Sequence, residues 1–292
     1  MNQTEREARI KEIEAAMLAT DFWSDKTKAQ AMIKELQELK DIADGGGKYD
    51  RANAVMTIFS GAGGDDSEDF SGMLLRMYFK YCERRGWGYE VLHENENDHG
   101  GYRNITIEIN GKGSYGDLKG ESGVHRLVRI SPFNANAKRH TSFSMVEVIP
   151  KFKKGEIEAL PESEVRLEYS RSGGAGGQNV NKRETAVRAI HEPTGLAVHM
   201  SAERSQLQNR ERALELLAAK VHHLRESLSD AEKEKMYVSK STQVEWGNQI
   251  RSYVLHPYKM VKDHRTDVEV HDVDRVLERG EIDEFIEAER AL

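Results

Sequence analysis

The sequence has few of the residues that stabilise secreted proteins or anchor proteins in membranes. One cysteine, Cys82, stands among 292 residues, which excludes an internal disulfide framework, and proline occurs only five times. No stretch approaches the ~20 consecutive apolar residues of a membrane-spanning helix. The N-terminus also lacks the apolar core of a signal peptide. We therefore expect a cytoplasmic protein without membrane contact, in which Cys82 is an inert core thiol.

The net charge of −7 argues against broad, nonspecific binding to nucleic acid, but the charges are unevenly placed. Residues 122–143 hold four basic side chains and no acid, and residues 171–212 hold an excess of Lys and Arg. Acidic residues gather at 65–69 instead. Cationic patches on an acidic body suit a protein that contacts RNA at defined places. Ordinary variation of surface charge accounts for the same pattern equally well.

Two segments indicate domain boundaries: the glycine-rich run 44–48 and the lysine-rich run 151–155. Hydrophobic residues recur at helical spacing before the first boundary, whereas helical and alternating patterns are mixed after it. We predict an α+β, multidomain fold with a helical hairpin at 1–43, an α+β domain at 44–155, an inserted α+β domain at 156–241, and a segment at 242–292 that packs on 44–155. The predicted strands cover 55–59, 104–109, 145–149, 165–169, 184–191, 196–200 and 250–255. The predicted helices include 66–85, closed by Gly86, and 205–227, with Leu207 and Leu217 on its buried face.

The run Arg171-Ser-Gly-Gly-Ala-Gly-Gly-Gln-Asn-Val-Asn-Lys182 is the most informative segment of the chain. Its glycines allow the backbone itself to approach a target closely. It is no phosphate-binding P-loop, because Gln178 and Asn179 stand where Lys and Ser or Thr are required. A dinucleotide-binding turn is excluded as well, since no helical run follows at once. A flexible surface turn is the alternative.

Gly176-Gly177-Gln178 within this run resembles the catalytic loop of class I peptide chain release factors. The resemblance implies that the loop enters the peptidyl-transferase centre of the ribosome. There the backbone N–H of Gln178 stabilises the developing oxyanion, and its side chain places a water beside the ester of peptidyl-tRNA. A neutral amide is no strong base, so it acts by positioning and hydrogen bonding. The resemblance also implies N5-methylation of Gln178 by a glutamine methyltransferase, and rRNA contacts from Arg171, Lys182, Arg183 and Arg188.

A second segment, residues 123–143, carries side chains that suit RNA recognition. Ser131 and Thr141 are able to donate or accept a hydrogen bond at a base edge, and Phe133 or His140 is able to stack on a splayed base. Pro132 fixes its own φ angle and stiffens the loop. A polar loop between two strands is the alternative.

Ser131-Pro132-Phe133 is similar to the tripeptide of the release factor 2 branch, which reads UAA and UGA stop codons. This resemblance implies that Ser131 accommodates a purine at the second position, that His140 stacks between the second and third bases, and that Thr141 contacts the third. The first uridine is read at a helix start, here Gly63 and Asp66, although the family usually has Glu where this chain has Asp66. By the same resemblance, we expect residues 44–155 to recognise the codon and residues 156–241 to promote hydrolysis of peptidyl-tRNA. The resemblance also implies a switch segment within residues 242–292, in which Trp246 is expected to stack on rRNA.

The implied partners are the ribosome through 16S and 23S rRNA, the mRNA stop codon and the P-site peptidyl-tRNA. No cofactor or metal is expected, and the chain is expected to act as a monomer that promotes ester hydrolysis only within the ribosome, not as a free-standing enzyme. The helical segment before residue 44 is shorter than is usual in the family. The resemblance therefore implies that contacts with the ribosomal stalk or a recycling GTPase are weakened or absent. A ribosome-rescue hydrolase without codon reading is the main alternative. We expect a compact free form that opens on the ribosome, with hinges near 151–157 and 239–247.

Overall fold

Helices and mostly antiparallel strands make up the chain, which confirms the predicted α+β class. The computed structural model describes residues 3–17, scattered positions between 26 and 47, and residues 49–152, 157, 159–171, 184–234 and 248–292. Two units are distinguished, Met1–Arg51 and Ala52–Leu292. In the first unit, α1 (Gln3–Met17) buries Ile13 in a small cluster with Leu36. Ile10, Met17 and Met32 pack against that cluster, so the predicted apolar face of this helix is confirmed.

An eight-stranded sheet forms the centre of the second unit, in the order β11-β10-β9-β4-β5-β1-β3-β2. Its strands are β1 (Ala54–Ser60), β2 (Gly88–Glu96), β3 (Tyr102–Asn110), β4 (Gly123–Ile130), β5 (Arg139–Pro150), β9 (Gln249–Val254), β10 (Met260–Asp263) and β11 (Glu269–Val270). Neighbouring strands are antiparallel except β4 and β9, which are parallel. The sequence did not predict β2 or β4. In β2 only Leu92 is buried, so the strand shows no alternation, and Arg126 and Arg129 interrupt the apolar pattern of β4.

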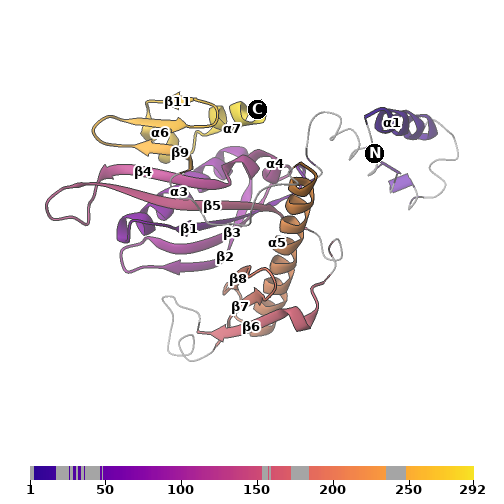
Figure 1. Ribbon diagram of the computed structural model, residues 1–292, viewed down its shortest axis with the longest axis horizontal. Helices are drawn as coiled ribbons and strands as arrows, with labels where there is room; N and C mark the ends of the chain where they lie inside the picture. Colours follow the sequence, from indigo (N-terminus) through magenta and orange to yellow (C-terminus); the bar gives the residue numbers. More distant parts are fainter. Residues whose placement is uncertain are drawn as a thin grey trace. The chain divides into compact units, whose positions relative to one another are not determined.

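Helix α3 (Asp65–Arg85) packs on one face of this sheet (Figure 1). The helix was predicted at 66–85, and its apolar side chains recur at helical spacing, so that Phe70, Leu74 and Tyr78 are fully buried on one face. The helix ends at Gly86, whose φ of 69° lies in the left-handed region that glycine adopts without strain. Cys82 lies on the buried side, where burial raises the pKa of its thiol to about 12. The short helices α4 (Ser114–Leu118), η2 (Lys119–Glu121), α6 (Val273–Leu277) and α7 (Asp283–Arg290) complete this part.

A three-stranded antiparallel sheet with one long helix follows in the chain. It consists of η3 (Glu162–Glu164), β6 (Val165–Ser170), β7 (Ala186–His191), β8 (Ala197–Met200) and α5 (Gln206–Glu234), which packs on β7 and β8. Leu217 is buried as predicted, but Leu207 is 60% exposed, so that part of the prediction was wrong. At this end of α5 the buried side chain is Asn209, which donates to the Thr185 carbonyl (2.8 Å), and Leu207 therefore faces away from the sheet.

The small sheet and α5 lie against the large sheet through a shared apolar core (Figure 1). Val55 and Ile149 of the large sheet belong to the same buried cluster as Val198 and Leu217. Polar contacts surround it. The Lys220 ammonium, 2.5 Å from the Glu147 carboxylate, also lies 5.7 Å from the centre of the Phe59 ring. Further contacts join Arg212 to Glu90 (2.8 Å) and the His93 ring to the Ser201 hydroxyl (3.0 Å).

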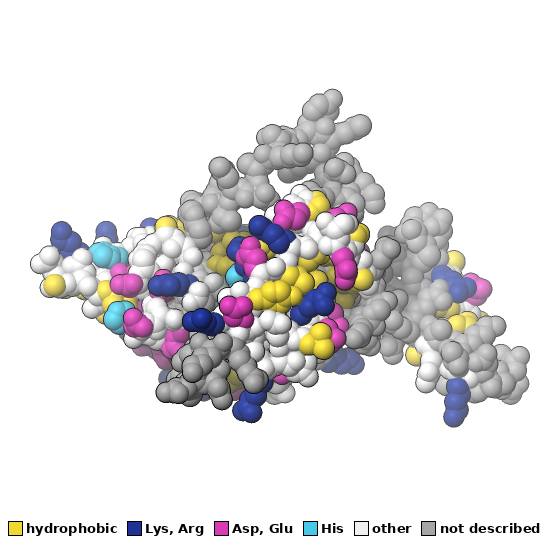
Figure 2. Space-filling view, turned by 90° about the horizontal axis from the view of Figure 1, so that it is seen from below, with side chains coloured by type: hydrophobic (Ala, Val, Ile, Leu, Met, Phe, Trp, Pro, Cys, Tyr) yellow, Lys and Arg dark blue, Asp and Glu magenta, His cyan; other side chains and the backbone are white. Residues whose placement is uncertain are grey.

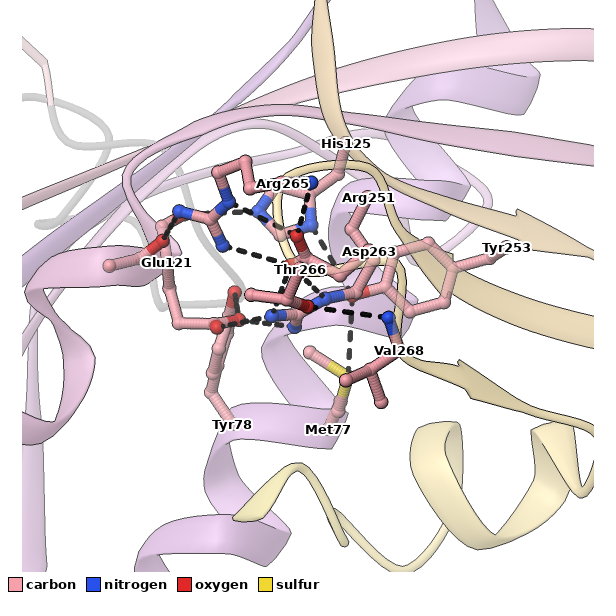
Figure 3. Close-up of polar contacts among 11 residues, drawn as sticks. Met77, Tyr78, Glu121, His125, Arg251, Tyr253, Asp263, Arg265, Thr266 and Val268 are labelled. Atoms are coloured by element: carbon pink, nitrogen blue, oxygen red, sulfur yellow. Dashed lines mark hydrogen bonds and ion pairs between the residues drawn. The ribbon is translucent and has the colours of Figure 1, made fainter. Parts of the chain in front are cut away.

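A buried ion cluster fastens the last strands to the large sheet (Figure 3). Arg251 of β9 is fully buried and binds the Glu121 carboxylate through two hydrogen bonds of 2.7 Å. It also donates to Asp263 of β10 (3.1 and 3.2 Å), which accepts further bonds from Arg265. Burial opposes ionisation of Glu121, but Arg251 outweighs it and holds the pKa of Glu121 below its ordinary value. Hydrogen bonds from Arg265 and the charge of Arg251 likewise overcome burial and lower the pKa of Asp263 to about 2.

His125 of β4 is a neutral member of this cluster. Its Nε2 lies 3.0 Å from the Glu121 carbonyl, which only accepts, so Nε2 carries the hydrogen and Nδ1 accepts from the Tyr253 hydroxyl (3.3 Å). Burial lowers the pKa of His125 to about 4, although the Glu121 carboxylate opposes that shift. The strand that leads to the predicted codon-reading loop is thus anchored at its first residues.

Candidate functional site

The predicted codon-reading tripeptide occupies the loop between β4 and β5 (Figure 1). Ile130 pairs with Arg139 at the end of the ladder, and the Ser131 N–H donates to the Lys138 carbonyl (3.0 Å), which closes the neck of the loop. Pro132 and Phe133 project beyond it, and Phe133 is 40% exposed. Ser131 is buried, and its hydroxyl accepts from the Phe133 N–H (3.2 Å). The loop therefore presents Pro132 and Phe133 outward while Ser131 organises it from within.

Asp66 in the first turn of α3 connects the other predicted reading residues. Its carboxylate lies 2.9 Å from His140 Nδ1 and accepts from Arg129 (3.2 Å), which also pairs with Asp69 (2.6 Å). Burial favours the neutral acid, but hydrogen bonds from Ser131, His140 and Arg129 outweigh it and lower the pKa of Asp66. The helix start favours an ionised carboxylate as well. Asp66 is therefore a charged hub that ties the helix to both strands of the loop.

Gly63 lies just before α3, close in sequence to Asp66. Its φ of 141° is rarely adopted by other residues, and a Cβ there would come within 3.0 Å of the Ser142 side chain. Thr141, the neighbour of Ser142 on β5, is exposed. The structure thus brings Gly63, Asp66, Ser131, His140 and Thr141 together at one end of the sheet. In the space-filling view, that end of the unit shows His, basic and acidic side chains next to one another (Figure 2).

The predicted hydrolysis loop begins and ends on the small sheet. Ser170 at the end of β6 pairs with Ala186 at the start of β7. Gly176, Gly177, Gln178, Lys182 and Arg183 lie between them, outside the described residues, as does Trp246. Arg171, the last described residue before the loop, is exposed. It lines a cavity of about 530 Å³ together with His93 and His199. Arg188 on β7 binds the Glu168 carboxylate (3.1 Å), an interaction that the sequence did not predict.

Within the described part of the chain, no group of three or more His, Cys, Asp or Glu side chains is arranged to hold a metal ion. None of the described helices combines the length and the apolar character needed to cross a bilayer.

Comparison with known proteins identifies the class to which this fold and site belong. Residues 45–146 match the model of the PCRF domain and residues 154–265 that of the RF-1 domain. Peptide chain release factor 2 of Clostridium perfringens is 46% identical over 262 residues, which cover 89% of this chain and 71% of the relative. Peptide chain release factor 2 of Staphylococcus epidermidis is 39% identical over 335 residues, covering 97% and 90% respectively. The solved structure of release factor 2 of Thermus thermophilus superposes with a TM-score of 0.75 at 38% identity, covering 97% of this chain and 80% of that one.

The chain therefore belongs to the peptide chain release factors, and within them to the release factor 2 branch, the translation termination factors that read UAA and UGA. Ribosome binding and interaction with the stop codon and peptidyl-tRNA follow from this membership. The codon-independent alternative considered above is not favoured.

Sequence reasoning missed several residues that shape the site. The sequence indicated Arg129 only as part of a basic patch, yet it bridges Asp66 and Asp69 from β4. Asn134, whose amide lies 3.2 Å from His140 Nε2, was not predicted either. The acidic run 65–69 was the available signal, because like charges at neighbouring helix positions repel one another and cationic partners relieve that repulsion.

Proposed function

We propose that the β4–β5 loop and the start of α3 together read the stop codon, and that Gly176-Gly177-Gln178 then promotes hydrolysis of the peptidyl-tRNA ester. The observation that carries the first half is the convergence on Asp66 of Ser131, Arg129 and His140 from three different positions in the chain. Such a network holds the loop in one conformation before the codon arrives, which reduces the entropy lost on binding.

Each reading residue has a distinct role in this proposal. Ser131 accommodates a purine at the second codon position, His140 stacks between the second and third bases, and Thr141 contacts the third. Phe133 and Pro132 complete the surface that faces the message. Gly63 and Asp66 serve the first uridine, where backbone groups at the helix start contribute. The exposure of Phe133 and Thr141 supports these roles, since bases in single-stranded RNA are read by stacking and edge contacts.

The hydrolytic half rests on the sequence of the loop. An uncharged amide such as that of Gln178 contributes by orienting water and by hydrogen bonding to the oxyanion, and each preorganised donor is worth ~3–4 kcal/mol. Gly176 and Gly177 allow the backbone to approach the ester. The chemistry takes place in a centre built of ribosomal RNA, so the chain is no free-standing enzyme. Arg171, Lys182, Arg183, Arg188 and Trp246 are the proposed contacts with that RNA.

The proposal extends to partners, compartment and domain movement. Gln178 is the proposed substrate of a glutamine methyltransferase, a recycling GTPase is a proposed partner, and the factor is expected to act as a cytoplasmic monomer. Residues 1–43, 44–155, 156–241 and 242–292 are the proposed domains. When the protein binds the ribosome, the 156–241 domain is proposed to move away from the large sheet. This movement breaks the Lys220–Glu147 and Arg212–Glu90 contacts described above.

A release assay tests this function directly. Ribosomes carry labelled peptidyl-tRNA in the P site and UAA, UGA, UAG or a sense codon in the A site, and peptide release is followed against factor concentration. We expect rapid release with UAA and UGA only, and its loss in Gln178→Ala and Gly177→Ala. Release that is equal on sense codons would instead indicate a rescue hydrolase. Normal release by Gln178→Ala would refute the hydrolytic role of the loop.

A further inference from the structure

A histidine from a third segment touches the reading tripeptide. The tip of the β2–β3 hairpin, residues 97–101, lies at the same end of the sheet as the β4–β5 loop (Figure 1). Its His99 ring lies 5.7 Å from the Phe133 ring, centre to centre, with 43° between the ring planes. Both side chains are exposed. The contact therefore lies at the surface that would face RNA.

The hairpin tip is held in place by hydrogen bonds to α3 and within the turn. The Asn97 amide donates to Glu68 of α3 (2.7 Å), and Arg103 donates to the other oxygen of the same carboxylate (3.1 Å). The Asn97 side-chain oxygen accepts from the backbone N–H groups of His99 (2.9 Å) and Gly101 (2.8 Å). A Cβ on Gly101 would lie 2.7 Å from the Asp69 nitrogen, so the tip lies directly on the helix backbone.

The first turn of α3 consequently supports both partners of the ring contact. Asp66 and Asp69 hold the β4–β5 loop through Arg129, and Glu68 between them holds the hairpin through Asn97 and Arg103. Two loops that are far apart in the sequence thus share one rigid base. Their relative placement, and that of His99 against Phe133, is fixed before any ligand binds.

We propose that His99 is a positioning residue of the codon reader, which orients the Phe133 ring for the stop codon. The inference rests on the function proposed above. His99 covers one side of Phe133 and restricts its rotamers, while the rest of the ring remains open to RNA. Tilted aromatic pairs of this separation are stabilising contacts, so losing the imidazole frees Phe133 to leave its reading conformation.

A double-mutant cycle on release kinetics tests this role. The full-length variants are His99→Ala, His99→Phe, Phe133→Ala and the double variant His99→Ala/Phe133→Ala. Release is measured against factor concentration on ribosomes with UAA or UGA. We expect His99→Ala to raise the half-saturating concentration about threefold to tenfold, in line with the energy of an aromatic pair, with the maximal rate unchanged. His99→Phe restores the wild-type value, and His99→Ala has no further effect in the Phe133→Ala background.

His271→Ala, which removes another exposed histidine away from the reader, is the matched control and behaves as wild type. Urea unfolding checks that each variant is folded. The inference is overturned if His99→Ala leaves half-saturation unchanged, lowers only the maximal rate, is not rescued by Phe, or acts equally strongly without Phe133. Failure of the proposed function differs from all of these, because the wild-type protein itself then releases no peptide at UAA or UGA.

Discussion

Two charged clusters of similar composition lie on the same sheet and are built differently. The cluster around Arg251 is closed: Glu121 and Asp263 pair with Arg251, and all of these side chains are buried. The cluster around Asp66 is open at one side, because His140 is only partly buried and its neighbour Thr141 is exposed.

The difference separates the task of holding the fold from the task of binding a ligand. In a closed cluster the buried polar atoms are bonded to one another and are not accessible to a ligand, so removing one of its side chains affects folding. An open cluster keeps its groups oriented but accessible, so its loss affects recognition first. Four predictions test this division.

The largest effect is expected for Arg251→Met. The substitution leaves the Glu121 carboxylate buried without its cation and leaves Asp263 with Arg265 alone. Breaking a buried pair in this way costs about 3–5 kcal/mol. Urea unfolding followed by circular dichroism measures the loss in the free energy of unfolding. The double variant Arg251→Met/Glu121→Gln should recover part of it, because one stranded charge is then removed. A loss below about 1 kcal/mol would mean that the cluster is not the anchor of β9.

The pH dependence of stability is the next largest effect. His125 remains neutral in the folded protein down to a pH of about 4, whereas in the unfolded chain it takes up a proton near 6.5. The unfolded state therefore binds more protons between these values, so the free energy of unfolding is highest above pH 6.5 and falls as the pH drops towards 4. At 1.36 kcal/mol per pKa unit, the share of His125 is about 3 kcal/mol.

His125→Gln is expected to reduce this slope, measured by urea unfolding from pH 7 to 4. Part of the slope remains, because burial also lowers the pKa of His93 to about 4. Asp263 contributes little in this window, because its stabilisation is lost mainly between its ordinary pKa of 3.8 and its folded pKa of about 2. An unchanged slope in the variant would show that His125 titrates normally in the folded protein.

A smaller effect on stability but a clear one on recognition is expected for Asp66→Asn. The amide keeps the shape but loses the charge that binds Arg129 and His140, and hydrogen bonds to charged groups are worth ~1.5–3 kcal/mol. If that energy orients the loop, the half-saturating concentration in UAA- or UGA-dependent release rises about tenfold to a hundredfold. The neighbouring, exposed Asp65→Asn serves as the control and should behave as wild type. Equal effects of the two substitutions would contradict the hub role.

The smallest effect is expected for Lys259→Ala. Lys259 pairs with Asp274 at 3.2 Å, but both side chains are largely exposed, and such pairs contribute little because water screens them. Neither the urea midpoint nor the release rate should change measurably. A clear loss of stability would show that exposure does not distinguish the two kinds of ion pair on this sheet.

The sequence revealed the elements with strong periodicity and the motifs with unusual composition. Helix α3 and the strand β3 followed from the spacing of their apolar residues, and the glycine-rich loop from its composition. It did not reveal β2, in which a single residue is buried, because an edge strand needs no alternating pattern. Leu207 was misplaced since a helical stripe does not show at which turn the helix meets the sheet.

The residues of the candidate site were mostly predictable from motifs, whereas their connections were not. Ser131, His140 and Asp66 were each identified, but the bonds of Asp66 to Arg129 and His140 join positions more than sixty residues apart. Such pairs form only when the sheet places β4 and β5 beside α3. The contact of His99 with Phe133 has the same origin, since nothing in the hairpin sequence indicates its neighbour.

The parallel pairing of β9 with β4 also bears on the order in which the chain folds. Val128 of the strand leading to the reader pairs with Val254, a partner that is synthesised only after the whole of the small sheet and α5. The small sheet and its helix are contiguous in the chain, so their local contacts are able to form first, whereas closing so long a loop is slow. We therefore expect the contacts between the small sheet and α5 to form on a nascent chain before β9 pairs with β4.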